Sequence, residues 1–270
     1  MKYNMTAEKR EELHHILMYK PSLEEGADCV AKTPSDPLSW YWYGVALGAA
    51  KHEQEALDAF SRGIACAPFV AVNYFGRGRR NNVLGRYWAA MADFTVAIQL
   101  DPTNWMYWYY RATTQVTHGE LAGAIQDFEE CTKLVPPEEM YPLVDWLYTT
   151  HAELGDFQAA VDALSLTDGK AACPRMDWGY KRSVLLYKGM VTPEEFIDIP
   201  LMEKEVLPNP GRVRLELNGL YYSLYWYWTI HGDESKAKAA IAELLKVAYP
   251  GAFAYAKAIP IAKRFGLLKE

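Results

Sequence analysis

Few residues of this chain have the types and spacing that catalysis requires. Gly76, Arg77 and Gly78 supply two glycines of a phosphate-binding loop, but the third glycine and the strand before it are missing. Gly169 and Lys170 lack the upstream glycine and the hydroxyl residue of a P-loop. The nucleophile motif G-x-S-x-G and the zinc motif H-E-x-x-H do not occur. We therefore predict no catalytic residues and a protein that is not an enzyme.

The histidines and cysteines do not have the spacing of metal ligands. His52, His118 and His231 stand at expected helix ends, where an imidazole suits the negative end of the helix dipole. The neighbours His14 and His15 would point about 100° apart on a helix, so they do not form a ligand pair. The cysteines form no C-x-x-C pair and are expected to be reduced thiols; they are Cys29, Cys66, Cys131 and Cys173. We predict neither a metal site nor a cofactor.

The composition argues against several other classes. Half of the 270 residues are hydrophobic and 23% are charged, so the chain can bury a sizeable core. The net charge of −6 argues against a nucleic-acid binder, whose affinity would come from clustered Lys and Arg. No run of about eighteen apolar residues occurs, so no membrane-spanning segment is expected. Charged residues interrupt the first twenty positions, which excludes the apolar part of a secretory signal, and a cytoplasmic protein is expected.

A period of 34 residues organises the chain. Prolines, phenylalanines, alanines, large aromatic residues and small residues recur with this step; the series are Pro34, Pro68, Pro102 and Pro136; Phe60, Phe94 and Phe128; Ala56, Ala90 and Ala124; Trp40, Tyr74 and Trp108; and Gly44, Gly78 and Ala112. With 9 Phe and 15 Pro in 270 residues, the joint chance of the Phe and Pro series is on the order of 10⁻⁸. The period therefore reflects a repeated structural unit.

Each unit is expected to be a pair of helices. In residues 71–104 the first helix ends at Gly85, which suits a left-handed cap, and the second ends before Pro102. Residues 37–70 and 105–138 repeat this arrangement. Because one pair cannot bury both of its faces, successive pairs must stack.

The series aromatic–small–Ala–Phe–small–Pro at 34 residues resembles the tetratricopeptide repeat, and residues 37–138 match three consecutive repeats. The resemblance implies an all-α fold, a right-handed superhelical solenoid of stacked antiparallel helix pairs. We expect a single solenoid over residues 1–270. Its expected parts are a degenerate N-terminal repeat at 3–36, three clear repeats at 37–138, two degenerate repeats and a linker at 141–211, a last repeat at 212–249 and a capping helix at 250–270.

In tetratricopeptide proteins the inner stripe of each first helix binds partners, so the resemblance implies a partner-binding groove. Mapped onto this sequence, the stripe consists of Leu38, Tyr41, Val45, Val72, Phe75, Arg79, Asn82, Met106, Tyr109, Thr113, Tyr222 and Trp226. Tyr41, Phe75 and Tyr109 follow the 34-residue step and are expected to form a ladder of rings. The predicted function is a non-enzymatic interaction scaffold that binds a peptide or helix of a partner protein, with Arg79 holding a carboxylate.

Three alternatives stay open beside this hypothesis. The chain's own C-terminal region is an alternative occupant of the groove. A self-associating homodimer, similar to bacterial tetratricopeptide lipoproteins that act as adaptors, is the second alternative. A ligand-binding regulator that uses the irregular region 166–211 as a lid is the third.

Two further interpretations concern charged groups on the repeats. The carboxylate-clamp repeats that hold chaperone tails need Lys and Asn where this chain has Tyr41 and Val45, so chaperone-tail binding is not expected. Arg77 and Arg111 occupy the same repeat position and belong to a local basic patch. For this patch we favour ion pairs with acidic residues of neighbouring helices, such as Asp93, over contact with an acidic partner or RNA.

Overall fold

The computed structural model describes residues 21–174, 177–205, 210–249 and 252–269. The chain divides into two compact units between Thr114 and Gln115. Each unit is described by itself, and the single continuous solenoid stays a prediction. The helix predicted before residue 21 and positions 207–209 of the predicted linker lie outside the described residues.

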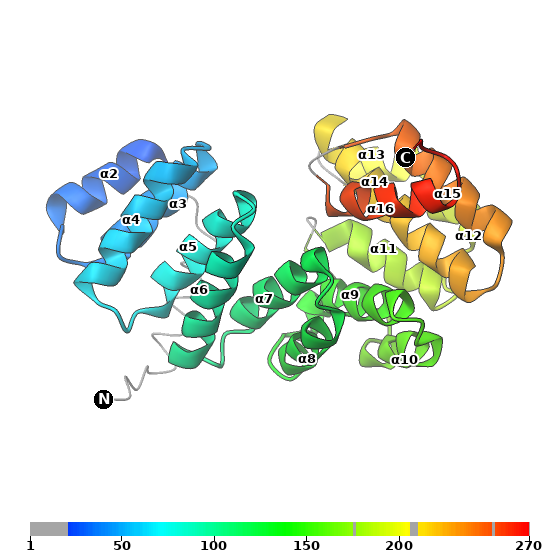
Figure 1. The fold of residues 1–270 in the computed structure, drawn as a ribbon, viewed down its shortest axis with the longest axis horizontal. Helices are drawn as coiled ribbons and strands as arrows, with labels where there is room; N and C mark the ends of the chain where they lie inside the picture. Colours follow the sequence, from blue (N-terminus) through cyan, green and yellow to red (C-terminus); the bar gives the residue numbers. More distant parts are fainter. Residues whose placement is uncertain (1–20, 175–176, 206–209, 250–251, 270) are drawn as a thin grey trace. The chain divides into compact units, whose positions relative to one another are not determined.

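The first unit is built from consecutive helices joined by short turns (Figure 1). They are α2 (Leu23–Lys32), α3 (Pro37–Ala49), α4 (Glu53–Cys66), α5 (Ala71–Val83), α6 (Tyr87–Leu100) and α7 (Trp105–His118), the last of which continues into the second unit. Helices α3 and α4 pack as a pair, α5 and α6 form the next pair, and α4 lies against α5. The residues that the structure describes contain no strand, so the predicted all-α fold of stacked helix pairs is confirmed.

Local sequence sets where these helices begin and end. Ser22 Oγ accepts a hydrogen bond from Glu25 N at 3.1 Å, and Glu25 Oε2 accepts one from Ser22 N at 2.7 Å, which caps α2. The turn between α5 and α6 has Gly85 at a φ of +69°. Lys51 occupies the equivalent turn one repeat earlier, and its φ is +64° although it is not a glycine. The repeat therefore imposes the left-handed turn even where the side chain disfavours it.

Small residues and phenylalanines of the repeat interlock where helices approach each other. A Cβ atom at Gly44 would lie 2.7 Å from the ring of Phe60, and one at Gly78 would lie 2.8 Å from the ring of Phe94. Both rings are buried. This contact explains why the sequence repeats a small residue and a phenylalanine with the same step, because any larger side chain would push the ring away.

The tryptophans and prolines of the repeat are also linked. The indole Nε1 of Trp40 donates to the carbonyl oxygen of Pro34 at 2.8 Å. Two repeats later, Trp108 Nε1 donates to the carbonyl oxygen of Pro102 at 3.0 Å. Each bond fixes the start of a first helix to the end of the preceding second helix.

Two arginines of the predicted basic patch form ion pairs within the first unit. Arg77 Nη2 lies 2.7 Å from Asp93 Oδ1, and Asn81 Nδ2 donates to Asp93 Oδ2 at 3.0 Å. Arg80 Nη1 pairs with Glu53 Oε2 at 3.2 Å. The favoured interpretation of Arg77 as an ion-pairing residue is confirmed.

The second unit contains helices joined partly by irregular connections. Its elements are α8 (Leu121–Thr132), η1 (Pro137–Glu139), α9 (Met140–Glu153), α10 (Phe157–Asp162), η2 (Ala163–Leu166), α11 (Trp178–Tyr187), α12 (Pro193–Phe196), α13 (Ile199–Glu205), α14 (Pro210–Ile230), α15 (Glu234–Lys246) and α16 (Phe253–Arg264). Helix α14 begins at Pro210, because a proline suits the first turn of a helix. The predicted linker is therefore wrong at its last two positions, 210 and 211, which belong to α14.

Helices α9, α11 and α14 meet around buried rings and a small polar network. The rings of Tyr148 and Tyr187 stack with their centroids 3.7 Å apart. The Tyr187 hydroxyl donates to Asp145 Oδ1 at 2.9 Å, and the hydroxyls of Ser183 and Ser223 lie 2.8 Å apart. Burial raises the pKa of Asp145 to about 7, and hydrogen bonds from Tyr187 and Ser223 partly offset that shift.

Candidate functional site

The predicted ring ladder of the first unit is not open to solvent. Tyr41 is 2% exposed and Phe75 is 0% exposed. The Tyr41 ring packs against Phe60 with centroids 5.9 Å apart, and the Phe75 ring lies 5.2 Å from that of Tyr110. Val72, expected in the parallel apolar ladder, is 1% exposed. The expectation that these three side chains line an open trough is corrected: neighbouring rings cover them, so they belong to the core.

The other predicted positions of the first unit remain reachable at its surface. These half-buried side chains are Leu38, Val45, Arg79, Asn82, Met106, Tyr109 and Thr113. They come from the first helices of three successive repeats, α3, α5 and α7. The accessible part of the predicted stripe thus consists of apolar and polar side chains that include one cation. It is not a row of exposed rings.

Arg79 is the cation of this set. Its guanidinium carbon lies 4.8 Å from the ring centroid of Tyr110 and 5.6 Å from that of Phe75. Among the residues that the structure describes, no hydrogen bond or ion pair joins its side chain. Its neighbours Arg77 and Arg80 are both ion-paired. Arg79 is therefore a positive charge that the fold holds in place without neutralising it.

Two further groups lie beside this charge. Burial raises the pKa of Tyr41, which the nearby charge of Arg79 partly offsets, so the Tyr41 hydroxyl stays neutral. Asn82 stands three residues after Arg79 on the same face of α5, and its side-chain amide makes no hydrogen bond to any described residue. The site therefore offers one full positive charge and one free amide, which can both donate and accept.

Sequence reasoning missed Tyr110. Its ring supports Arg79 and covers Phe75, although the corresponding positions one and two repeats earlier are Gly76 and Trp42. The 34-residue period therefore contained no signal for it. The adjacent aromatic pair formed with Tyr109 was the available hint, because two neighbouring rings on a helix face different sides.

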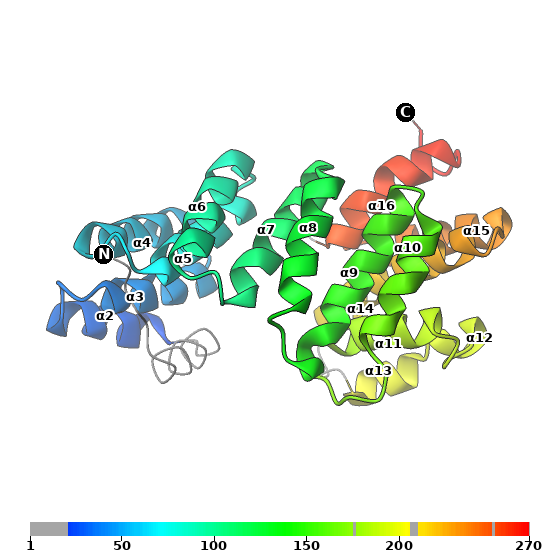
Figure 2. The ribbon, with the colours of Figure 1, turned by 90° about the horizontal axis from the view of Figure 1, so that it is seen from below.

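In the second unit, the chain's own C-terminal helix lies over the predicted stripe. Figure 2 shows α16 beside α14, and the Phe253 ring lies 4.6 Å from that of Trp146 and 6.3 Å from that of Tyr222. Tyr222 and Trp226 are each 6% exposed. The expectation that these two side chains line an open groove is corrected, because the alternative occupant is present here.

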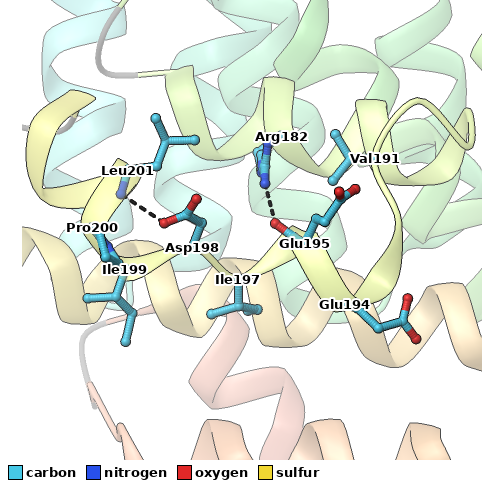
Figure 3. Close-up of a pocket in the computed structure, with 9 residues that line it drawn as sticks. All are labelled: Arg182, Val191, Glu194, Glu195, Ile197, Asp198, Ile199, Pro200 and Leu201. Atoms are coloured by element: carbon cyan, nitrogen blue, oxygen red, sulfur yellow. Dashed lines mark hydrogen bonds between the residues drawn. The ribbon is translucent and has the colours of Figure 1, made fainter.

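The irregular region before α14 holds a shallow pocket (Figure 3). Arg182 Nε donates to the carbonyl oxygen of Phe196 at 3.1 Å, and Arg182 Nη2 donates to that of Glu195. Asp198 Oδ1 accepts a hydrogen bond from Leu201 N at 2.9 Å at the start of α13. Arg182 thus ties α12 to α11 and Asp198 caps α13, so both side chains serve the backbone of the segment rather than a ligand.

The described residues also show no activated thiol at Cys173, no metal site and no membrane-spanning helix. Burial raises the pKa of Cys173, which the charge of Lys181 partly offsets, so the thiol is less reactive than a free one. Within residues 21–174, 177–205, 210–249 and 252–269, no group of three or more His, Cys, Asp or Glu side chains could hold a metal ion. None of the described helices combines the length and the apolar character needed to cross a membrane.

The paired helices, the 34-residue period and the interlocked small residues are those of a tetratricopeptide-type fold of stacked helix pairs. No known family profile and no curated protein sequence matches the chain. Solved structures do match it. One is YrrB, a tetratricopeptide protein with an unusual peptide-binding site, at 13% identity over 90% of this chain and 100% of that one, with a TM-score of 0.52.

Two further structures share this arrangement. A tetratricopeptide repeat protein from Parabacteroides merdae has 14% identity over 89% of this chain and 91% of that one, with a TM-score of 0.54. A chain of the APC/C hetero-tetramer Cut9-Hcn1 has 15% identity, a TM-score of 0.55 and coverage of 87% of this chain and 45% of that one. At these identities the similarity establishes the fold alone: the chain has the fold of the tetratricopeptide superfamily.

Proposed function

We propose that the protein is an interaction scaffold whose first unit binds an extended peptide segment of a partner, with a carboxylate of that segment on Arg79. The observation that carries the proposal is the unpaired guanidinium of Arg79, seated on the rings of Tyr110 and Phe75. The proposal involves no catalytic step. The tetratricopeptide fold supports it, since solenoids of this kind present side chains from successive repeats along one surface.

The chemistry of Arg79 favours a carboxylate. A guanidinium has five N–H donors in a planar fork that matches the two oxygens of a carboxylate. The Tyr110 and Phe75 rings restrict the side chain before the partner arrives, so less conformational entropy is lost on binding. Because Arg79 is only half-buried, its charge remains accessible and is not fully desolvated in the free protein.

The neighbouring side chains suit an extended peptide. The amide of Asn82 can hydrogen-bond a peptide backbone, which presents both a donor and an acceptor. Leu38, Val45 and Met106 are half-buried apolar side chains. Binding is favoured when an apolar group of the partner buries their remaining exposed surface. A few such contacts with one charged anchor are consistent with micromolar affinity, which corresponds to about −8 kcal/mol.

The test starts from peptides selected for binding to the full chain in an unbiased display library. We expect the selected peptides to share an Asp, a Glu or a free C-terminal carboxylate, and Arg79→Gln to weaken their binding by about tenfold or more. Fluorescence anisotropy with labelled synthetic peptides measures this. The matched control is Arg86→Gln, an exposed arginine at the nearby turn whose loss should change nothing. Selected peptides that bind the Arg79→Gln variant as tightly as the unchanged protein would refute the proposal.

A further inference from the structure

A cavity of about 600 Å³ lies within the second unit, between one face of α16 and the helices beside it. Helix α16 contributes Phe253, Lys257, Ile261 and Arg264, which are spaced by three or four residues and so share one face. The alanines of the opposite face, Ala254, Ala258 and Ala262, are buried in the core of the unit. The alanine face therefore packs α16 onto the core, and the opposite face lines the cavity.

Aromatic rings form much of the wall. Tyr222, Tyr225 and Trp226 of α14 line the cavity opposite Phe253. The indole N–H of Trp226 is buried and makes no hydrogen bond of ordinary geometry within the described residues. A flat aromatic molecule would meet ring faces and edges here, and an acceptor that reached the indole could give it a hydrogen bond of ordinary geometry.

The charged side chains that line the cavity determine which ligand charge it favours. Lys257 Nζ lies 2.7 Å from Glu153 Oε1, so these two charges neutralise each other. Arg264 Nη2 donates at 2.9 Å to the hydroxyl of Tyr225, and no ion pair joins Arg264 to a carboxylate in the described part of the chain. The uncompensated charge among the described lining residues is therefore the positive charge of Arg264.

We propose that this cavity binds a small aromatic carboxylate, with its ring system against Tyr222, Trp226 and Phe253 and its carboxylate on Arg264. The volume lies within the range of about 300–1,000 Å³ that is typical of small-molecule sites. An aromatic cation would meet Arg264 as a like charge and bind less well. This site lies in the second unit and does not depend on the function proposed for the first.

The experiment uses isothermal titration calorimetry on the full chain with 2-naphthylacetate as the probe. The matched ligand control is 2-(2-naphthyl)ethylamine, which carries the same ring system on a cation. We expect submillimolar binding of the acid and binding of the amine that is weaker by about tenfold or more. Absence of acid binding up to millimolar concentration, or equal binding of acid and amine, would overturn the proposal.

Three variants locate the site. Arg264→Gln should weaken binding of 2-naphthylacetate by about tenfold or more, and Lys263→Gln should leave it unchanged, because Lys263 is exposed on the same helix and does not line the cavity. Ala256→Phe adds a ring to the cavity wall and should abolish binding while circular dichroism still shows a folded chain. Equal affinity in the Arg264→Gln and Lys263→Gln proteins, or unchanged binding by a folded Ala256→Phe protein, would contradict the assignment.

Discussion

Phe75 shows how a residue on the predicted binding stripe belongs to the core. Its ring is 0% exposed and lies 5.0 Å from that of Tyr107 and 6.1 Å from that of Phe94. Phe75→Ala removes these contacts and leaves a cavity, so we expect the free energy of unfolding to fall by about 3–5 kcal/mol. Urea denaturation followed by circular dichroism measures this. Tyr109→Ala, the half-buried equivalent one repeat later, is the control and should cost clearly less.

An unchanged unfolding midpoint for Phe75→Ala would show that this ring is not part of the core. At this scale the sequence predicted which residue types repeat, but not which of them are covered. Burial of Phe75 depends on Tyr110, which departs from the 34-residue period, and so no local pattern predicted it. Arg79 was predicted as a carboxylate anchor from its position on the stripe, and its proposed role now rests on its stacking and on the absence of an ion pair with any described residue.

At the scale of elements, helix starts and turns were the most predictable features. Thr192 and Pro193 have the residue types of a helix start, and Thr192 Oγ1 accepts a hydrogen bond from Glu195 N at 3.3 Å at the beginning of α12. Such signals are local, because the cap and its partner are three residues apart. Pro200, the second residue of α13, has no backbone N–H to bond the carbonyl oxygen of Phe196, which accounts for the break between α12 and α13.

The contact of α9, α11 and α14 around Asp145 leads to a pH-dependent stability. Burial raises the folded pKa of Asp145 to about 7, whereas an unfolded aspartate has a pKa of about 3.9. Between these values the folded state keeps a proton that the unfolded state has lost, so stability is lost as the pH rises through that window. Urea denaturation at pH 5 and pH 8 should show this fall for the unchanged protein, and Asp145→Asn should reduce it by roughly 2–3 kcal/mol.

The control for this prediction is Asp58→Asn, which removes an exposed carboxylate on α4 and should leave the pH dependence as it is. The difference between Asp145→Asn and the unchanged protein isolates the contribution of Asp145 from that of the other titratable groups. Identical pH dependence in the Asp145→Asn and unchanged proteins would mean that Asp145 is ionised throughout, with no raised pKa.

At the scale of the whole molecule, the period predicted the fold where it continues and little beyond. Residues 37–138 repeat in register, and their helices form as expected. The closing helix α16 was expected at the end of the chain, but its packing against α14 was not predicted. The sequence left open whether a partner or the C-terminal region covers the stripe. The position of α16 depends on a match between its alanine face and a core formed by distant residues, and such a match has no local signature.

The net charge of the whole chain makes a separate prediction about the proposed peptide binding. The chain carries −6 at pH 7 and so repels an acidic peptide at long range, whereas Arg79 attracts its carboxylate only at contact. Salt screens both effects, since the Debye length is about 10 Å at 0.1 M. Raising NaCl from about 20 to about 200 mM should therefore speed association roughly twofold and also speed dissociation, which leaves the affinity little changed. Stopped-flow fluorescence with a labelled acidic peptide measures both rates. A peptide with Gln in place of the acidic residue should associate at a nearly constant rate, and an association rate of the acidic peptide that falls with salt would show that a local positive field outweighs the net charge.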